Sequence, residues 1–393
     1  MIRNERYTIY IMKRIAFLPL TLALALVLSG CGAGKGIYAN YRAIEELQTV
    51  QTLGLDQDDR GRTVALAGMR TSGEEASAIL RRSGDSILLA IRALEDYTDR
   101  GQLFFAHARY VLLGRAQAEA GFGPLLDYTE RDPLTRMGAS VFVLKNSSVE
   151  TLLAEIGDGN KLASTLESIR RNTELWGGSQ VTDLRSTAVA LSEYGAALVC
   201  ALSVEPTEGS VLSDGPATIP VPDGYAILKG GALVDFLQGG QAETVGLLQG
   251  RPAVVTRRLP VDGGGSVTVS LRSGGADIQP VWETGKLVLE IRLPLLAVIA
   301  EADDVRVPIT QGPVPEDLAA EISDQVTEEL EQVLALSKTL DADFLALARQ
   351  LRLKGVSPTT DWLQNVEFRV SVETVIDNSN DLHESLSTGG SEQ

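Results

Sequence analysis

Two stretches near the C-terminus decide the fold: residues 315–334 read PEDLAAEISDQVTEELEQVL, and residues 366–375 read VEFRVSVETV. In the first stretch, apolar residues recur at every fourth position with acidic residues between them, namely Leu318, Ile322, Val326, Leu330 and Leu334. This spacing predicts a long amphipathic helix over Pro315–Leu351. The second stretch alternates apolar and polar residues, as a strand with one exposed face does. A partner-docking helix has the same pattern as a core helix, but we expect a core helix because a strand follows it.

Strand patterns also precede this helix. Tyr225–Leu228 and Ala232–Phe236 flank Lys229-Gly230-Gly231, which predicts a hairpin. Apolar residues then alternate with polar ones around residues 267–271 and 287–293, as in half-buried antiparallel strands. We therefore expect residues 218–376 to form an α+β domain in which the helix lies on one face of the sheet.

The first half of the chain mixes helical and strand patterns. Asp85–Tyr97 has helical spacing and Ala139–Leu144 reads as a short buried strand. Ser147 and Glu150 form a capping-box pattern that predicts the start of a helix. Cys200 lies in the apolar stretch 183–203, where a lone cysteine is expected to be a small buried hydrophobe.

The predicted fold class is α+β, multidomain, with mixed or antiparallel sheets each packed with helices. A Pro-, Gly- and Ser-rich segment predicts a linker at 206–217. It separates an N-terminal region at 37–205, of one or two subdomains, from the domain at 218–376. Residues 377–393 are polar and small, which predicts a disordered tail.

Composition excludes several classes of function. The 393-residue chain carries a formal net charge of −17, which repels phosphate backbones, so we expect no nucleic-acid partner. It has two cysteines and two histidines, too few for the usual four-ligand zinc site, and we expect no metal and no cofactor. Cys31 and Cys200 could form at most one disulfide, so cysteine usage leaves the redox compartment open.

The N-terminus predicts a lipoprotein signal peptide over residues 1–30. Lys13 and Arg14 precede the apolar run 15–28, which is shorter than the ~20 residues of a membrane span. Leu28, Ser29, Gly30 and Cys31 then fit a bacterial lipobox, in which the Cys31 thiol is the nucleophile that accepts diacylglycerol. Two acyl chains on Cys31 would hold the protein stably on a bilayer. Met12, directly before Lys13, is an alternative start to Met1.

This segment has two alternative interpretations. An ordinary secretory signal with a chance cysteine fits less well, because small residues and a cysteine coincide at the expected position. A phosphate-binding loop at residues 32–36 lacks the glycine five residues before Gly34-Lys35 and the Ser or Thr after them. We therefore interpret residues 31–36 as a lipidated tether.

No catalytic constellation stands out in the sequence. His107 lies among apolar residues, where a hydrogen-bonded structural role is favoured, and there is no G-x-S-x-G motif for a nucleophile to occupy. Asp341 and Asp343 are expected to be solvated surface carboxylates. Arg131, Asp132 and Arg136 are interpreted as an ion-pair corner, with an anion site as the alternative.

Several stretches, taken in order, resemble the lipoprotein C subunits of spore germinant receptors, the Ger(x)C or GerAC-like family. Beyond the lipobox they are Glu45-Glu46-Leu47, Leu53-Gly54-Leu55-Asp56, LFFAHARYVLLG (103–114), LLDYTERDPLTRMGASVFVL (125–144), GYAILKGGALVDFLQGGQAET (224–244, with Glu243 at the family's glutamate) and LDADFLALARQL (340–351). Gly32-Ala33 departs from the Trp-Asp that members often carry after the lipidated cysteine.

The resemblance implies a non-enzymatic receptor subunit with three mixed α/β domains. Its implied partners are A-type and B-type integral membrane subunits, and its implied location is the outer face of the spore inner membrane, anchored through diacylglyceryl Cys31. The alternative is a solute-binding lipoprotein of a transporter, but such proteins form two lobes of parallel sheet, unlike the antiparallel pattern after residue 218. An envelope hydrolase is the weakest alternative, because no nucleophile–base pair is visible.

Overall fold

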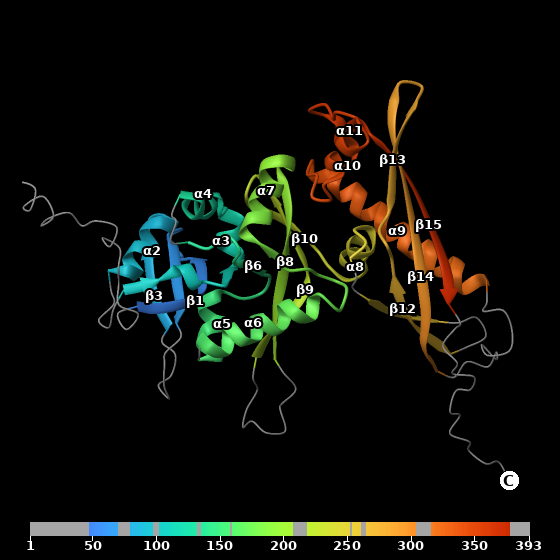
Figure 1. Cartoon of the computed structure of the whole chain (residues 1–393). Coiled ribbons are helices and arrows are strands. Elements are labelled where there is room, and N and C mark those ends of the chain that lie inside the picture. The colour runs from blue at the N-terminus through green and yellow to red at the C-terminus, as the bar shows by residue number, and fades with distance from the viewer. Residues whose placement is uncertain are drawn as a thin grey trace, which may run out of the picture. The chain divides into compact units, whose positions relative to one another are not determined.

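The structure is a computed structural model that describes residues 47–69, 79–96, 102–131, 135–157, 159–206, 218–251, 254–260, 265–303 and 316–377. Within these ranges two sheets are packed with helices (Figure 1), and the expected α+β class is confirmed. The predicted signal peptide, lipobox and tether, and nearly all of the predicted linker and tail, lie outside the described residues.

The first sheet has mixed strand directions and runs in the order β10-β9-β8-β6-β5-β1-β2-β3, with β4 paired to β1 and β7 to β6. Its central strands β1, β5, β6 and β8 are parallel, and the outer pairs are antiparallel. The strands are β1 (Leu47–Gln57), β2 (Thr63–Met69), β3 (Ile79–Gly84), β4 (Gln102–Phe104), β5 (Tyr110–Leu113), β6 (Ser140–Leu144), β7 (Thr182–Asp183), β8 (Ala196–Pro206), β9 (Thr218–Lys229) and β10 (Ala232–Leu237).

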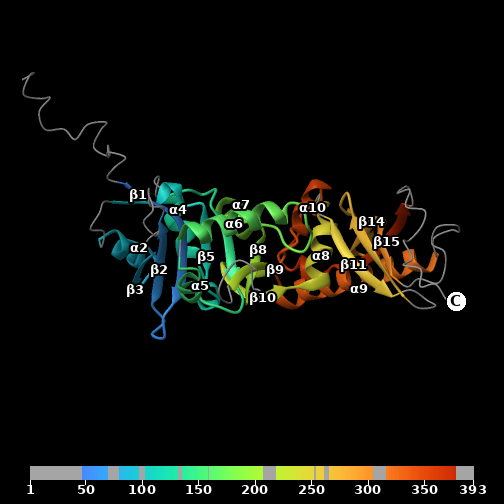
Figure 2. The same cartoon turned by 90° about the horizontal axis from the view of Figure 1, so that it is seen from below.

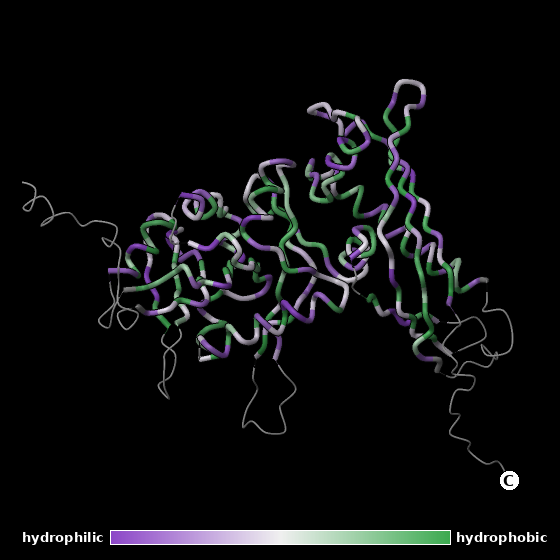
Figure 3. Tube along the Cα trace, in the orientation of Figure 1, coloured by the Kyte–Doolittle hydropathy of each residue, from purple (hydrophilic) through white to green (hydrophobic). Residues whose placement is uncertain are grey.

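Helices cover both faces of this sheet, and its central strands β5 and β6 are buried at every position. Val111 and Leu113 of β5 belong to one core, whereas Tyr110 and Leu112 belong to the other. In Figure 3 the tube is green, the hydrophobic colour, along much of β8. One face of the sheet packs against α2 (Ile87–Glu95), α3 (Arg115–Ala120), α4 (Gly123–Arg131) and α7 (Leu184–Tyr194). The other face packs against α5 (Val149–Ile156) and α6 (Gly159–Thr173). A 3₁₀ turn, η2, spans Phe105–His107.

The second sheet is built around the long strand β14, which pairs antiparallel with β12 and β13 and parallel with β15. Its strands are β11 (Val255–Pro260), β12 (Ser266–Arg272), β13 (Asp277–Glu283), β14 (Lys286–Asp303) and β15 (Glu367–Asp377). The helices are α8 (Gly239–Leu248), α9 (Glu316–Leu340), α10 (Leu347–Leu353) and α11 (Trp362–Asn365). Helix α9 lies along β15 (Figure 2).

The predicted helix stripe is confirmed, since Leu318, Ile322, Val326, Leu330 and Leu334 are all at most 3% exposed in the core of the second sheet. The predicted extent of the helix is wrong. Helix α9 ends at Leu340, and α10 begins at Leu347 after a turn in which Asp341 and Ala346 have φ of 48° and 56°. The Asp343 carboxylate accepts hydrogen bonds from the amides of Leu347 and Ala348. These bonds hold the start of a second helix, α10, so the first helix does not continue.

The predicted hairpin at Lys229-Gly230-Gly231 is confirmed, and both glycines have the positive φ of a two-residue hairpin turn, 59° and 87°. The sheet to which this hairpin belongs differs from the expectation. Strand β9 pairs with β8 along nearly its whole length, so residues 218–237 extend the first sheet instead of opening the second. Alternation predicts a strand but not its neighbour, because pairing is a long-range contact.

The predicted capping box is displaced by one residue. Helix α5 begins at Val149, and its N-cap is Ser148, whose hydroxyl accepts from the Thr151 amide at 3.0 Å. The Ser147 hydroxyl instead donates a hydrogen bond to the carbonyl of Ser148. Cys200 is fully buried, as expected.

Candidate functional site

A cleft of about 820 Å³ opens beside the central strands of the first sheet. Its wall comes from residues just before or at the start of β5 and β6, from the C-terminal half of α6, from residues 180–183 and from the start of α7. Arg251, which follows α8, completes the lining. This volume falls within the range of small-molecule sites in proteins.

Glu167 of α6 organises one wall of the cleft. Its carboxylate accepts hydrogen bonds from Arg109 at 2.8 Å, Tyr110 at 2.5 Å, Arg170 at 3.0 Å and Arg171 at 3.0 Å. The bonds from Arg170 and Tyr110 lower the pKa of Glu167 to about 2, so this carboxylate stays ionised. Burial and the bond to Glu167 raise the pKa of Tyr110 to about 12, so its hydroxyl stays protonated and remains a donor.

Two other arginines of the lining have no such acceptor. Arg136 is exposed, and Arg251 is half-buried. Within the described residues neither side chain forms a hydrogen bond or an ion pair. Burial lowers the pKa of Arg251, as expected for a cation moved away from water without an anion.

Backbone contacts hold the segment that carries Arg251. The Arg251 amide donates to the Gly246 carbonyl at 3.3 Å at the end of α8. Shortly beyond it, Val254 forms a parallel bridge with Trp176 and accepts from the Gly177 amide at 2.9 Å. The guanidinium is therefore placed at the cleft by backbone bonds on both sides of it.

The predicted ion-pair corner of Arg131, Asp132 and Arg136 stays a prediction, because one of its members is not described. Arg131 pairs with Asp127 of its own helix at 2.8 Å, Asp132 lies outside the described residues, and Arg136 lines the cleft. Sequence reasoning missed Arg109, Glu167, Arg170 and Arg251 as members of one site. The helical spacings of Glu167 with Arg170 and Arg171 could have signalled contacts, because residues three and four apart on a helix are neighbours.

The other predicted chemistry-bearing residues take structural positions. His107 is exposed, and its ring is tilted by 49° against the ring of Phe104, with centroids 5.2 Å apart. The expected side-chain hydrogen bond of His107 is not formed within the described residues. Asp343 is 5% exposed, which corrects its assignment as a solvated carboxylate, whereas Asp341 is exposed as expected. Burial raises the pKa of the Cys200 thiol to about 12, so Cys200 is unreactive at neutral pH.

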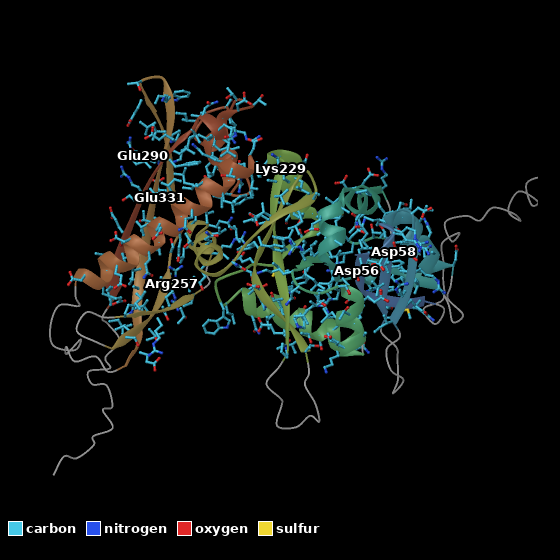
Figure 4. All side chains as sticks on the ribbon, turned by 180° about the vertical axis from the view of Figure 1, so that it is seen from behind. Asp56, Asp58, Lys229, Arg257, Glu290 and Glu331 are labelled. Carbon is cyan, nitrogen blue, oxygen red and sulfur yellow. The ribbon has the colours of Figure 1, made fainter. Side chains whose placement is uncertain are left out.

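Asp56 and Glu243, which lie in the stretches that resemble the GerAC-like family, each form an internal contact. Asp56 is 5% exposed and accepts from the amides of Val149 at 3.0 Å and Glu150 at 2.8 Å, at the N-terminus of α5 (Figure 4). Burial raises the pKa of Asp56, and the two amides oppose that rise. Asp56 therefore joins β1 to α5.

Glu243 of α8 forms the second contact. Arg257 of β11, labelled in Figure 4, donates to Glu243 at 3.1 Å and to Glu329 of α9 at 2.8 Å. Burial raises the pKa of Glu243, and Arg257 counteracts it. A β-carbon on Gly240 would lie 2.0 Å from Glu329 Oε1, so a side chain there would displace the Glu329 carboxylate. This network ties α8, α9 and the sheet together.

The lipobox residues Leu28, Ser29, Gly30 and Cys31 lie outside the described residues. In the described part of the chain, no helix is both long and apolar enough to cross a bilayer. No group of three or more His, Cys, Asp or Glu residues in that part could hold a metal ion.

Comparison with known proteins gives two family matches. The spore germination protein N-terminal domain matches residues 40–204, and the spore germination B3/GerAC-like C-terminal domain matches residues 223–380. Among solved structures, the crystal structure of the GerBC protein is similar at a TM-score of 0.50 and 15% identity, over 86% of this chain and 100% of that chain. At that identity the similarity is one of fold. No curated protein matches the chain significantly.

Proposed function

Because the two family domains together span most of the chain, this chain belongs to the GerAC-like family of spore germination proteins, and we propose that it is the lipoprotein C subunit of a nutrient germinant receptor. The match of both domains in order is the observation that carries the proposal. The family predicted from the sequence is thereby confirmed. No comparison above supports the transporter alternative.

The proposed role is non-enzymatic and acts through protein contacts at the membrane. Several of the groups that could do chemistry have structural partners in the described residues. Asp56 and Asp343 hold helix N-termini, Glu243 is paired with Arg257, and Cys200 is buried. This use of ionisable groups supports a scaffold that presents surfaces to A-type and B-type integral membrane subunits.

The proposed anchor is a diacylglyceryl group on Cys31, which would place the folded domains at the outer face of the spore inner membrane. The lipobox supports this proposal, because an aliphatic residue and two small residues precede the cysteine. The net charge of −17 also favours a hydrophobic attachment over binding to anionic headgroups.

The anchor is tested by metabolic labelling with a fatty acid in the spore-forming host. We expect the natural chain to incorporate label and Cys31→Ala to incorporate none. Cys200→Ala is the matched control, since it removes the other cysteine and should keep the label. Label retained on Cys31→Ala would exclude lipidation at this residue.

The receptor role is tested by deleting the gene and measuring nutrient-triggered germination, with a tagged chain used to recover partners from spore membranes. We expect the deletion to impair germination and the natural chain to restore it. We also expect A-type and B-type subunits to co-purify with the tagged chain. Normal germination in spores that lack the gene and all its paralogues would contradict the proposed role.

A further inference from the structure

The cleft in the first sheet has an excess of positive charge on an acidic protein. Four arginines line it against three carboxylates, whereas the whole chain has a net charge of −17. A guanidinium that loses water needs an anion or hydrogen-bond acceptors in exchange, because uncompensated burial of charge is costly.

The carboxylates of the lining are already engaged. Glu167 accepts from Arg109 and Arg170, and Glu174 accepts from Arg170 at 2.8 Å. Asp183 caps α7 by accepting from the Ser186 amide at 2.7 Å. Arg136 and Arg251 are left, within the described residues, without a carboxylate partner.

The neighbouring helix does not supply an alternative anion site. The first amides of α7 are used, since Leu184 donates to the Ala139 carbonyl at 3.0 Å and Arg185 donates to the Met137 carbonyl at 3.0 Å. An anion in the cleft would therefore contact guanidinium groups, which form paired hydrogen bonds with carboxylate and phosphate oxygens. The hydroxyls of Ser140 and Ser186 lie in the same lining as further donors.

We propose that this cleft binds a small soluble oxyanion with two negative charges, a phosphate or a dicarboxylate, held between Arg136 and Arg251. Two cations that have no ion-pair partner among the described residues match two negative charges, and a volume of about 820 Å³ leaves room for such a molecule. A polyanion is disfavoured, because the net charge of −17 on the chain repels it at longer range. The proposal concerns a ligand of this chain alone and does not depend on the receptor role.

The binding test uses the full chain purified in a neutral detergent, with titration calorimetry at about pH 8, where phosphate carries two negative charges. The probes are inorganic phosphate and succinate, with acetate and chloride as monovalent comparisons at matched ionic strength. Vesicles of phosphatidylcholine and phosphatidylglycerol form a separate arm that reports binding to lipid headgroups.

We expect saturable binding of phosphate, succinate or both, and weaker binding of the monovalent anions. Arg136→Gln and Arg251→Gln should each weaken binding about tenfold, as expected for one lost charge-assisted contact. The matched control is Arg272→Gln on β12, which removes the same charge from an exposed arginine outside the cleft. It should leave the affinity within about twofold, because screening weakens interactions between distant surface charges.

Stability provides a second readout that separates ligand binding from a structural role. Because Arg251 forms no hydrogen bond or ion pair through its side chain in the described residues, Arg251→Gln should leave the unfolding midpoint unchanged or raise it while binding weakens about tenfold. The proposal is overturned if neither dianion binds, if chloride binds as well as phosphate, or if Arg272→Gln weakens binding as much as the cleft variants. Binding to the anionic vesicles alone would likewise overturn it in favour of a lipid headgroup.

Discussion

Gly114, at the end of β5, has no room for a side chain. A β-carbon there would lie 1.9 Å from Oδ1 of Asp56, whereas real contacts stay above about 3 Å. The backbone of Gly114 has φ of −67° and ψ of 153°, which alanine adopts without strain. Its amide is tied to the Leu55 carbonyl at 2.9 Å, so the carboxylate would have to move instead. Gly114→Ala therefore perturbs Asp56 and little else.

The cost can be worked out from the two amides that Asp56 holds. A displacement of about 1 Å would lengthen its bonds to Val149 and Glu150 beyond hydrogen-bonding distance, and each bond to a charged group is worth about 1.5–3 kcal/mol. The reduced freedom of the unfolded chain returns about 0.4–1 kcal/mol. If the carboxylate relaxes enough to keep part of these bonds, the net loss in unfolding free energy should be about 2–3 kcal/mol.

The assay is urea unfolding of the full chain followed by circular dichroism, with Gly123→Ala as the matched control. Gly123 has open space where its β-carbon would be, so its substitution should be close to neutral. In an Asp56→Ala background the new methyl group would occupy the vacated space, so Gly114→Ala should then cost less than about 0.5 kcal/mol. An equal cost in both backgrounds would refute the proposed clash with Asp56.

Three further predictions concern α5, α9 and the segment between α9 and α10. Arg257→Leu should lower the unfolding free energy by about 3 kcal/mol at neutral pH, because it leaves two partly buried carboxylates without their cation. Denaturant unfolding should show a smaller loss in acid, where the carboxylates are protonated. A loss of unfolding free energy that does not depend on pH would contradict the prediction. Burial raises the pKa of Asp343 to about 6, so between about pH 4 and 6 the folded state holds a proton that the unfolded state has released. The stability contributed by Asp343 should thus fall as pH rises through that window. Asp343→Asn should flatten that part of the measured curve of unfolding free energy against pH. If the variant and the natural chain give the same curve, the raised pKa of Asp343 is excluded. Ser148→Ala should lower the unfolding free energy by about 1 kcal/mol, because it removes the N-cap of α5, and Ser147→Ala should lower it by less than half as much. Thermal unfolding measures both losses. A larger loss for Ser147→Ala would identify Ser147 as the N-cap.

Local patterns predicted the elements that repeat over many residues. The apolar stripe of α9, the alternation of β15 and the glycine pair of the β9–β10 hairpin all appear where expected. These features depend on the period of a helix or strand and on turn geometry, which neighbouring residues set by themselves.

Errors arose where a distant contact outweighed the local pattern. Asp343 interrupts the predicted helix because its buried carboxylate accepts two amides of the next helix. Residues 218–237 read as the start of a new domain, yet β9 completes the first sheet beside β8. Neither partner is encoded in the spacing of nearby residues.

The sequence by itself determined the α+β class, the candidate lipidation site at Cys31 and the family, since these follow from periodicity, composition and motifs in order. Only the tertiary structure brought Arg109, Arg136, Glu167 and Arg251 into one cleft. Which arginines have an acceptor and which do not depends on distances across the fold. Such distances are set when separate elements pack together, and a linear pattern of charges does not contain them.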